Sequence, residues 1–286
     1  MKKNKNLFKK PAWLNKRIDF KKCDKLNKLL KDLKLNTICQ EALCPNISEC
    51  FSKGVATFLI MGNVCTRGCN FCAVQKGSPQ KLDPDEPKRV AEAIKRLGLK
   101  HVVITSVTRD DLADGGARAF IDNIEAIREL DGKVRIEVLV PDFKGRFESI
   151  REVIEAEPDI FAHNLETVPR FYKEARKGAS YQRSLSILEI AKELNANMHT
   201  KSGLMLGLGE REEEILEVFS DLRKAKCDFL SLGQYLAPSH SHLKVKEYIN
   251  LKKFDFYKEK ALKLGFRYVA SGPYVRSSYL ACDYLG

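Results

Sequence analysis

The chain has 286 residues, of which 44% are hydrophobic and 31% are charged, and its net charge is +12. This is the composition of a soluble globular protein, long enough for one large domain that buries roughly three quarters of its unfolded surface. No apolar run approaches the roughly 20 residues that span a bilayer, and the lysine-rich N-terminus lacks the apolar core of a signal peptide. We therefore expect a cytoplasmic protein without membrane contact, whose nine cysteines are not paired as disulfides.

The N-terminal region is predicted to contain one helix followed by a group of cysteines. Leucines at helical spacing indicate the helix over 24–35. Cys39, Cys44 and Cys50 follow in the spacing C-x4-C-x5-C, and a proline within the group predicts a loop. Trp13 is the only tryptophan, and we expect its segment to pack onto the main domain.

Strands and helices alternate in the rest of the chain. Strands are expected over 57–62, 101–105, 133–140, 159–165, 197–206, 228–234 and 268–271. Helices are expected over 90–97, 117–130, 147–157, 184–194, 212–225 and 254–264, the last ended by a glycine. Six repeats of strand then helix imply a parallel sheet with right-handed crossovers.

We predict an α/β protein with a partial (β/α)6 barrel of the TIM type rather than a doubly wound sheet. The reason is that polar residues fall in or just after the strands, at the end where barrel enzymes place their chemistry. These residues are Cys65, Thr105, Ser106, Glu137, Asn164, Glu166, Lys201 and Gln234.

A second cysteine group follows the first strand of the barrel. Cys65, Cys69 and Cys72 have the spacing C-x3-C-x2-C, with Phe71 before the last of them. Three thiolates on one loop can hold three corners of an iron–sulfur cubane and leave its fourth iron without a protein ligand. The alternatives are half of a zinc site and a disulfide framework. Structural zinc sites usually take four ligands, and disulfides do not suit a chain without a secretory signal.

This second motif closely resembles the signature of the radical S-adenosylmethionine (SAM) enzymes. The resemblance implies that the amino and carboxylate groups of SAM chelate the fourth iron. It also implies that one electron from the cluster splits SAM into methionine and a 5′-deoxyadenosyl radical. The motif indicates a superfamily and leaves the reaction open.

Both cysteine triplets, together with Arg276-Ser277-Ser278-Tyr279 and several intervening segments, resemble lipoyl synthase over about residues 11–281. The segments are 105–112, 114–116, 163–168, 181–185, 200–210 and 233–236. The resemblance implies the insertion of two sulfur atoms, at carbons six and eight of an octanoyl chain attached to a lysine of a lipoyl carrier domain. Those C–H bonds are unactivated, so a cofactor-derived radical is needed.

The resemblance assigns a [4Fe-4S] cluster to each triplet. The cluster on Cys65, Cys69 and Cys72 cleaves SAM. The auxiliary cluster on Cys39, Cys44 and Cys50 supplies the sulfur and is consumed. Its remaining iron takes Ser278 as a ligand, with Ser277 as the fallback.

Several polar residues near the expected mouth of the barrel are candidates for binding SAM. They are Thr105, Ser106, Asn164, Glu166, Arg183 and Lys201. The alternative for Asn164 and Glu166 is a polar cap on the next turn, and for Arg183 and Lys201 it is pairing with local carboxylates. His163 and His199 are interpreted as satisfied interior histidines.

The resemblance also implies an organisation and partners. The N-terminal extension with the auxiliary cysteines would span 1–52, the radical SAM barrel 53–272 and the tail with the serine ligand 273–286. The partners would be octanoylated lipoyl carrier domains, such as the glycine cleavage H protein and the acyltransferase subunits of 2-oxoacid dehydrogenases, and a reductant such as ferredoxin or flavodoxin. The implied carrier is acidic, and the charge of +12 would attract it.

Two other functions are compatible with parts of the sequence. A radical SAM methylthiotransferase acting on RNA would place its auxiliary cysteines in a separate N-terminal domain, for which about forty residues are too few. An iron–sulfur electron carrier or nucleic-acid-binding sensor would cleave no SAM, and its positive charge would contact phosphate. No nucleic-acid-binding module accompanies the charge, so we expect no nucleic-acid partner.

Overall fold

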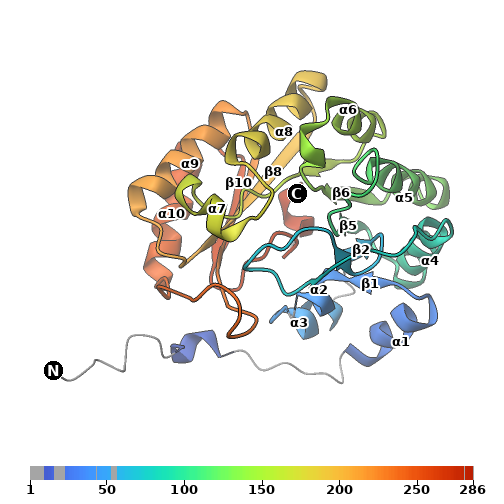
Figure 1. Ribbon diagram of the computed structural model, residues 1–286, viewed down its shortest axis with the longest axis horizontal. Coiled ribbons are helices and arrows are strands. Elements are labelled where there is room, and N and C mark those ends of the chain that lie inside the picture. Colours follow the sequence, from blue (N-terminus) through green and yellow to red (C-terminus); the bar gives the residue numbers. More distant parts are fainter. Residues whose placement is uncertain (1–9, 16–22, 43, 53–56, 280, 286) are drawn as a thin grey trace.

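The computed structural model describes residues 10–15, 23–42, 44–52, 57–279 and 281–285. Within these ranges, parallel strands form one curved sheet in the order β2-β5-β6-β7-β8-β9-β10. They are β2 (Thr57–Ile60), β5 (His101–Ser106), β6 (Arg135–Leu139), β7 (Ile160–Ala162), β8 (His199–Leu206), β9 (Phe229–Gln234) and β10 (Tyr268–Gly272). The strands curve around a central space with the helices outside (Figure 1), which confirms the predicted α/β partial barrel.

Three very short strands were not predicted. β1 (Asn36–Thr37) pairs antiparallel with β2 at one edge of the sheet. β3 (Val64–Cys65) and β4 (Gln75–Lys76) form a separate parallel pair. Each has two residues, too few to show an alternating pattern in the sequence.

The six long helices surround the sheet, and three of them begin before their predicted starts. They are α4 (Glu86–Leu97), α5 (Ala117–Leu130), α6 (Phe147–Glu155), α8 (Tyr181–Leu194), α9 (Glu212–Lys224) and α10 (Leu251–Lys263). α4 has a proline in its first turn, and the caps of α8 and α10 are Ser180 and Asn250, whose side chains accept backbone N–H bonds. Polar capping residues mark a helix start that the apolar pattern misses. Gly265, with φ +97°, follows α10 as predicted.

The N-terminal region differs from the prediction in its cysteine segment. α1 (Asp24–Asp32) is present, but the cysteine segment forms two short helices, α2 (Ile38–Glu41) and α3 (Ile47–Ser52), instead of a loop. Pro45 lies between the two helices and separates them. Leu14 is fully buried, so the segment packs onto the domain as expected, although 37% of Trp13 itself is exposed.

The C-terminal segment after β10 lies inside the barrel. Its last turn, η5 (Ala281–Tyr284), packs against the first residues of β9 and β10, and the C-terminal end lies within the ring of strands in Figure 1. The barrel is thus filled at the N-terminal ends of its strands and hollow at their carboxyl ends, where an open cavity lies.

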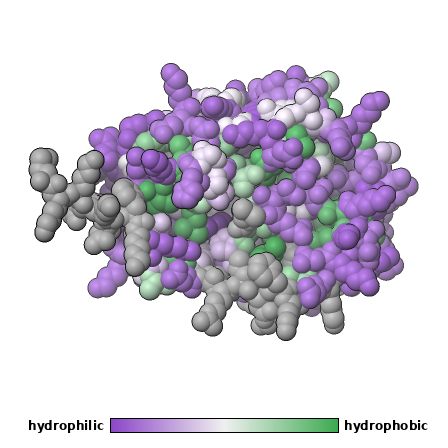
Figure 2. Space-filling view, turned by 60° about the horizontal axis from the view of Figure 1, so that its bottom comes forward, coloured by the Kyte–Doolittle hydropathy of each residue, from purple (hydrophilic) through white to green (hydrophobic). Residues whose placement is uncertain are grey.

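The face of the molecule shown in Figure 2 is mainly hydrophilic where it is not covered by grey atoms. Figure 2 shows charged and polar residues over most of one face, with hydrophobic residues in small separate areas. Within the described ranges, no helix combines the length and apolar character needed to cross a membrane.

Candidate active site

The loop with the C-x3-C-x2-C motif is closed at its two ends by short strands. Cys65 lies in β3, and β3 pairs with β4, so the three cysteines project from a loop whose ends are hydrogen-bonded together. The turn that leads from β2 into the loop contains Met61 at φ +66° and Gly62 at φ +83°. The buried Glu86 carboxylate accepts the Met61 N–H at 2.8 Å and fixes this turn.

The loops that follow β5, β6 and β7 hold the cysteine loop against the barrel. Thr66 N–H donates to the Thr108 carbonyl at 3.1 Å, after β5. The Arg67 guanidinium contacts Asp110 at 2.7 Å and Asp142 at 2.6 Å, and Asp142 follows β6. Further along, Asn70 N–H donates to the carbonyl of Ala175, in α7 (Tyr172–Ala175). The loop therefore has a fixed position relative to three neighbouring strands.

The sulfur atoms of this loop have the environment of iron–sulfur ligands. Cys65 Sγ accepts N–H bonds from Arg67 at 3.4 Å and Thr108 at 3.3 Å. Hydrogen bonds to sulfur are one of the means by which proteins tune such clusters. Burial raises the pKa of Cys72 to about 11 and also raises that of Cys69, so these thiols keep their protons until a metal replaces them.

The first triplet lies opposite this loop. Cys39 is in α2, Cys50 is in α3, and Cys44 lies between the helices. Burial, and secondly Cys44, raises the pKa of Cys39 to about 11. Across the described residues, no three His, Cys, Asp or Glu side chains converge as the ligands of a single metal ion do. A cubane binds each thiolate to a different iron, so its ligands are spread more widely.

The tail is fastened to the helices that carry the first triplet. Asn46 Nδ2 donates to the Tyr274 carbonyl at 2.6 Å, and Tyr279 Oη donates to Glu49 Oε1 at 3.0 Å. These contacts bring Ser278, between the two tyrosines in the sequence, to the cavity that the cysteines line.

One cavity of about 570 Å³ extends from the first triplet to Cys72 of the second. Its polar lining includes Cys39, Cys44, Cys50, Cys72, Thr105, Asn164, Glu166, Ser231, Ser277 and Ser278. Much of the remaining wall is apolar and includes Phe71, Leu139, Leu204, Met205 and Leu236. The predicted ligands of the auxiliary cluster and one cysteine of the SAM-type motif therefore face a single chamber.

Asn164 and Glu166 are linked to each other and to the tail. Asn164 Nδ2 donates to Glu166 Oε1 at 3.0 Å, and Ser277 Oγ donates to Asn164 Oδ1 at 3.1 Å. Glu166 has φ +68°, and burial raises the pKa of its carboxyl. Thr105 lines the cavity, but its hydroxyl donates to the Leu139 carbonyl at 2.9 Å. Ser106 does not line the cavity, and its buried hydroxyl has no partner among the described residues.

Two predicted cofactor-binding cations lie elsewhere. Lys201 is the third residue of β8, so it lies towards the base of the barrel and not at its mouth. Its fully buried ammonium is 2.9 Å from Glu137, which is likewise deep in the barrel. Arg183 contacts Asp142 at 2.8 Å and does not line the cavity. For both cations, pairing with a local carboxylate is the interpretation that the contacts favour.

The histidines divide between expected and unexpected roles. His163 is a satisfied interior residue as predicted, because its Nδ1 donates to the Val140 carbonyl at 2.9 Å and its Nε2 lies 3.1 Å from Ser184 Oγ. His199 is partly exposed beside Arg267, so the interior prediction is wrong for it. His242, one of two histidines spaced i, i+2 to which the sequence assigned no role beyond the surface near the mouth, donates through Nε2 to the Cys72 carbonyl at 3.0 Å. The sequence shows no link between those two residues, which are 170 positions apart.

Arg176 is a second site residue that the sequence did not indicate. Its guanidinium is almost fully buried and donates to the Asn164 carbonyl at 2.9 Å and to Tyr172 Oη at 3.0 Å. It supplies positive charge beside the Glu166 carboxylate, although burial outweighs that effect on the pKa of Glu166. Arg176 lies 12 residues after Asn164 on the same connection that follows β7.

Comparisons with known proteins agree with this arrangement. The Radical SAM superfamily model matches residues 59–222. The lipoyl synthase of Caldanaerobacter subterraneus subsp. tengcongensis is 56% identical over 273 residues, 96% of each chain. That of Geobacter sp. strain M21 is 55% identical over 278 residues, 97% of this chain and 95% of its own.

Solved structures with the same fold are more distant in sequence. The crystal structure of methylornithine synthase superposes with a TM-score of 0.56 at 17% identity, covering 85% of this chain and 81% of its own. Such a likeness concerns the fold alone. The identity to the relatives above is high and spans almost the whole chain, and the chain therefore belongs to the lipoyl synthase family of the radical SAM superfamily.

Proposed function

We propose that this chain is a lipoyl synthase that inserts two sulfur atoms, at carbons six and eight of an octanoyl chain attached to a lysine of a lipoyl carrier domain. The observation that carries the proposal is the single cavity lined by Cys39, Cys44 and Cys50 and by Cys72 of the second triplet. A sulfur donor must lie within reach of the carbon that is activated. Family membership, with 56% identity over nearly the whole chain, supports the same reaction.

The two triplets would hold two [4Fe-4S] clusters. Cys65, Cys69 and Cys72 would hold the cluster that binds SAM. Cys39, Cys44 and Cys50 would hold the auxiliary cluster, with Ser278 as a further ligand. When bound, these groups supply the radical chemistry and the sulfur that amino-acid side chains lack. The donor sets fit, since Cys39 is buried, the other five cysteines are half-buried, and Cys65 Sγ already accepts two backbone N–H bonds.

The other cavity residues would bind and orient the two substrates. Glu166 and Asn164 present acceptors suited to the amino group and ribose of SAM, and Arg176 holds their loop in place. The apolar wall, which includes Phe71 and Leu204, would exclude water and receive the octanoyl chain. Positioning a C–H bond beside its reaction partner is the main contribution that such a wall can make.

The partners follow from the reaction. The substrates would be octanoylated lipoyl domains, with the glycine cleavage H protein and the acyltransferase subunits of 2-oxoacid dehydrogenases as the specific candidates. The electrons would come from a reductant such as ferredoxin or flavodoxin, in the cytoplasm. We retain the division into 1–52, 53–272 and 273–286 as the organisation that serves this reaction.

An anaerobic assay tests the proposed function. The protein is reconstituted with iron and sulfide and given SAM, a strong reductant and an octanoyl-lysine peptide. A peptide that gains two sulfurs, with formation of 5′-deoxyadenosine, is the expected result. Deoxyadenosine without peptide sulfur would move the substrate to another class, such as RNA. Neither product, with both clusters confirmed by iron count, would favour an electron carrier.

A further inference from the structure

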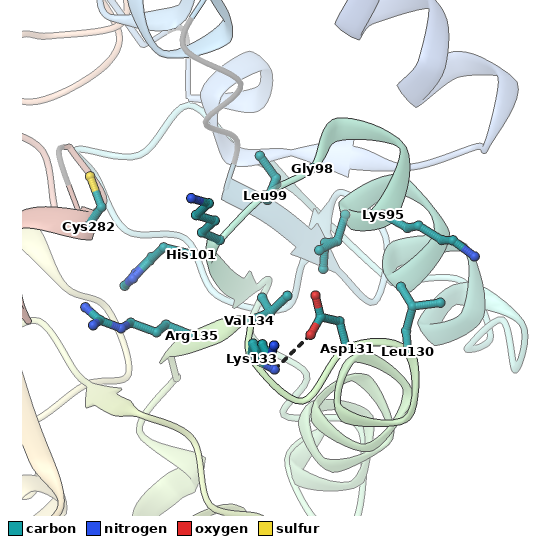
Figure 3. Close-up of a pocket in the computed structure, with 12 residues that line it drawn as sticks. Lys95, Gly98, Leu99, His101, Leu130, Asp131, Lys133, Val134, Arg135 and Cys282 are labelled. Carbon is teal, nitrogen blue, oxygen red and sulfur yellow. Dashed lines mark hydrogen bonds between the residues drawn. The ribbon is translucent and has the colours of Figure 1, made fainter.

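The C-terminal tail passes through the barrel from its mouth to its base. Ser277 and Ser278 line the cavity at the mouth. The turn η5 then lies at the opposite end, where Cys282 lines a second cavity of about 780 Å³ together with His101 and Arg135. These three residues lie on one side of that cavity, opposite Lys95 and Leu130 (Figure 3). The tail therefore reaches the starts of β5 and β6.

Tyr284 holds the tail at the base of the barrel. It is only 4% exposed, and its ring meets the rings of Phe229 and Tyr268 edge-on, with centroids 5.5 Å and 4.7 Å apart. Ala281, at the start of the same turn, is 1% exposed. We call Ala281 and Tyr284 the tail anchor.

The tail anchor covers a buried ion pair. Lys201 Nζ lies 3.7 Å from the centroid of the Tyr284 ring and 2.9 Å from Glu137 Oε1. Both charged side chains are fully buried. A buried ion pair needs favourable contacts on the sides where its two groups do not touch each other. The face of an aromatic ring makes such a contact with an ammonium group. The ion pair therefore provides a binding position that favours an aromatic residue.

The tether between the tail anchor and Ser278 is short. Tyr284 follows Ser278 by six residues, so their Cα atoms are at most about 20 Å apart even in an extended chain. The immediate neighbours of the serine are also held, Ser277 by Asn164 before it and Tyr279 by Glu49 after it. The serine is thus restrained from both directions.

We propose that the tail anchor, packed on the Lys201–Glu137 pair, keeps Ser278 in position at the auxiliary cysteines. This proposal rests on the proposed function, in which Ser278 is a cluster ligand. A tether raises the local concentration of a weak oxygen ligand without adding a contact to it. Tyr284, Lys201 and Glu137 are accordingly positioning residues and touch neither substrate nor cluster.

Iron release from the reconstituted full-length protein tests the proposal. The readout is the rate at which a chelator removes the irons of the two clusters, followed in Tyr284→Ala and in Tyr284→Phe. The matched control is Phe, because the Tyr284 hydroxyl has no hydrogen-bond partner among the described residues. We expect Tyr284→Ala to lose one cluster's iron about tenfold faster or more, with the other cluster and SAM cleavage unchanged. Tyr284→Phe should match the unsubstituted protein.

Two further variants keep the outcomes distinct. Ser278→Ala should release iron at least as fast as Tyr284→Ala. Fast iron release in Ser278→Ala with normal release in Tyr284→Ala would overturn the positioning role of the tail anchor and leave Ser278 as a cluster ligand. Normal iron release in Ser278→Ala would instead show that Ser278 is not a cluster ligand, against the proposed function. Tyr284→Leu replaces Tyr284→Ala if the alanine variant fails to fold, because leucine keeps an apolar side chain without an aromatic face. Normal iron release in Tyr284→Leu would also overturn the role of the aromatic contact with the ion pair.

Discussion

The two cysteine triplets are built in opposite ways. Cys65, Cys69 and Cys72 lie within eight residues, on one loop closed by β3 and β4 and held by neighbouring barrel loops. The auxiliary triplet uses two short helices, and its contacts to the tail join residues 228 and 230 positions apart. A local loop can be specified by spacing alone, whereas the auxiliary site depends on how the whole chain folds.

The largest expected effect separates the chemistry of the two triplets. Cys69→Ala should abolish deoxyadenosine formation, because the cluster that binds SAM loses one of its three thiolates. Cys44→Ala should still form deoxyadenosine but insert no sulfur. Both products are measured in one anaerobic assay. Equal loss of deoxyadenosine in both variants would mean that the two sites do not function separately.

The next prediction tests how firmly the loop with the C-x3-C-x2-C motif, here called the SAM-type loop, is held in place. Arg67→Ala removes a 7% exposed guanidinium from Asp110 and from the buried Asp142. Because Arg183 still contacts Asp142 at 2.8 Å, the buried carboxylate keeps one cationic partner, and the expected loss of unfolding free energy is about 2 kcal/mol, in the range of a charged hydrogen bond. Urea denaturation measures the loss. Arg118→Ala is the control, because this exposed pair with Asp122 contributes less than about 1 kcal/mol. A loss for Arg67→Ala no larger than the control's would show that its ion pairs do not hold the loop.

Acid should weaken the barrel behind the SAM-type loop through His163. Burial, then the nearby Arg176 charge, lowers the pKa of His163 from 6.5 to about 4. The unfolded chain therefore binds more protons between these values, so stability is present above pH 6.5 and falls as the pH falls towards 4. The slope from this residue is about 1.4 kcal/mol per pH unit. His163→Gln should show a shallower decline in urea denaturation series; an unchanged slope would assign the acid sensitivity to other groups.

The smallest effect probes the auxiliary site. Tyr279→Phe removes one hydrogen bond, from the phenol to Glu49 at 3.0 Å, and leaves the ring in place. A bond from a neutral donor to a carboxylate contributes about 1.5 to 3 kcal/mol when buried, and this half-exposed one should contribute about 1 kcal/mol. A fall in thermal midpoint of a few degrees should accompany a faster loss of auxiliary iron. A fall in midpoint with unchanged iron loss would confine the bond to a structural role.

The sequence predicted the parts of this molecule that depend on short-range pattern. The alternation of strands and helices and the spacing of Cys65, Cys69 and Cys72 required only neighbouring residues. The position of Lys201 was predicted wrongly because β8 has eight residues, so its third residue lies near the base. The contacts of Tyr279 with Glu49 and of His242 with Cys72 join distant segments, and no local pattern encodes them.

The long separation between Asn46 and Tyr274 has a consequence for the order of folding. Contacts between segments so far apart carry a high loop-closure entropy and form late, after the local strand–helix units have assembled. The tail that carries Ser278 reaches the auxiliary cysteines only when the intervening strands have taken their places in the sheet. Completion of the auxiliary site by its serine is thereby coupled to completion of the barrel.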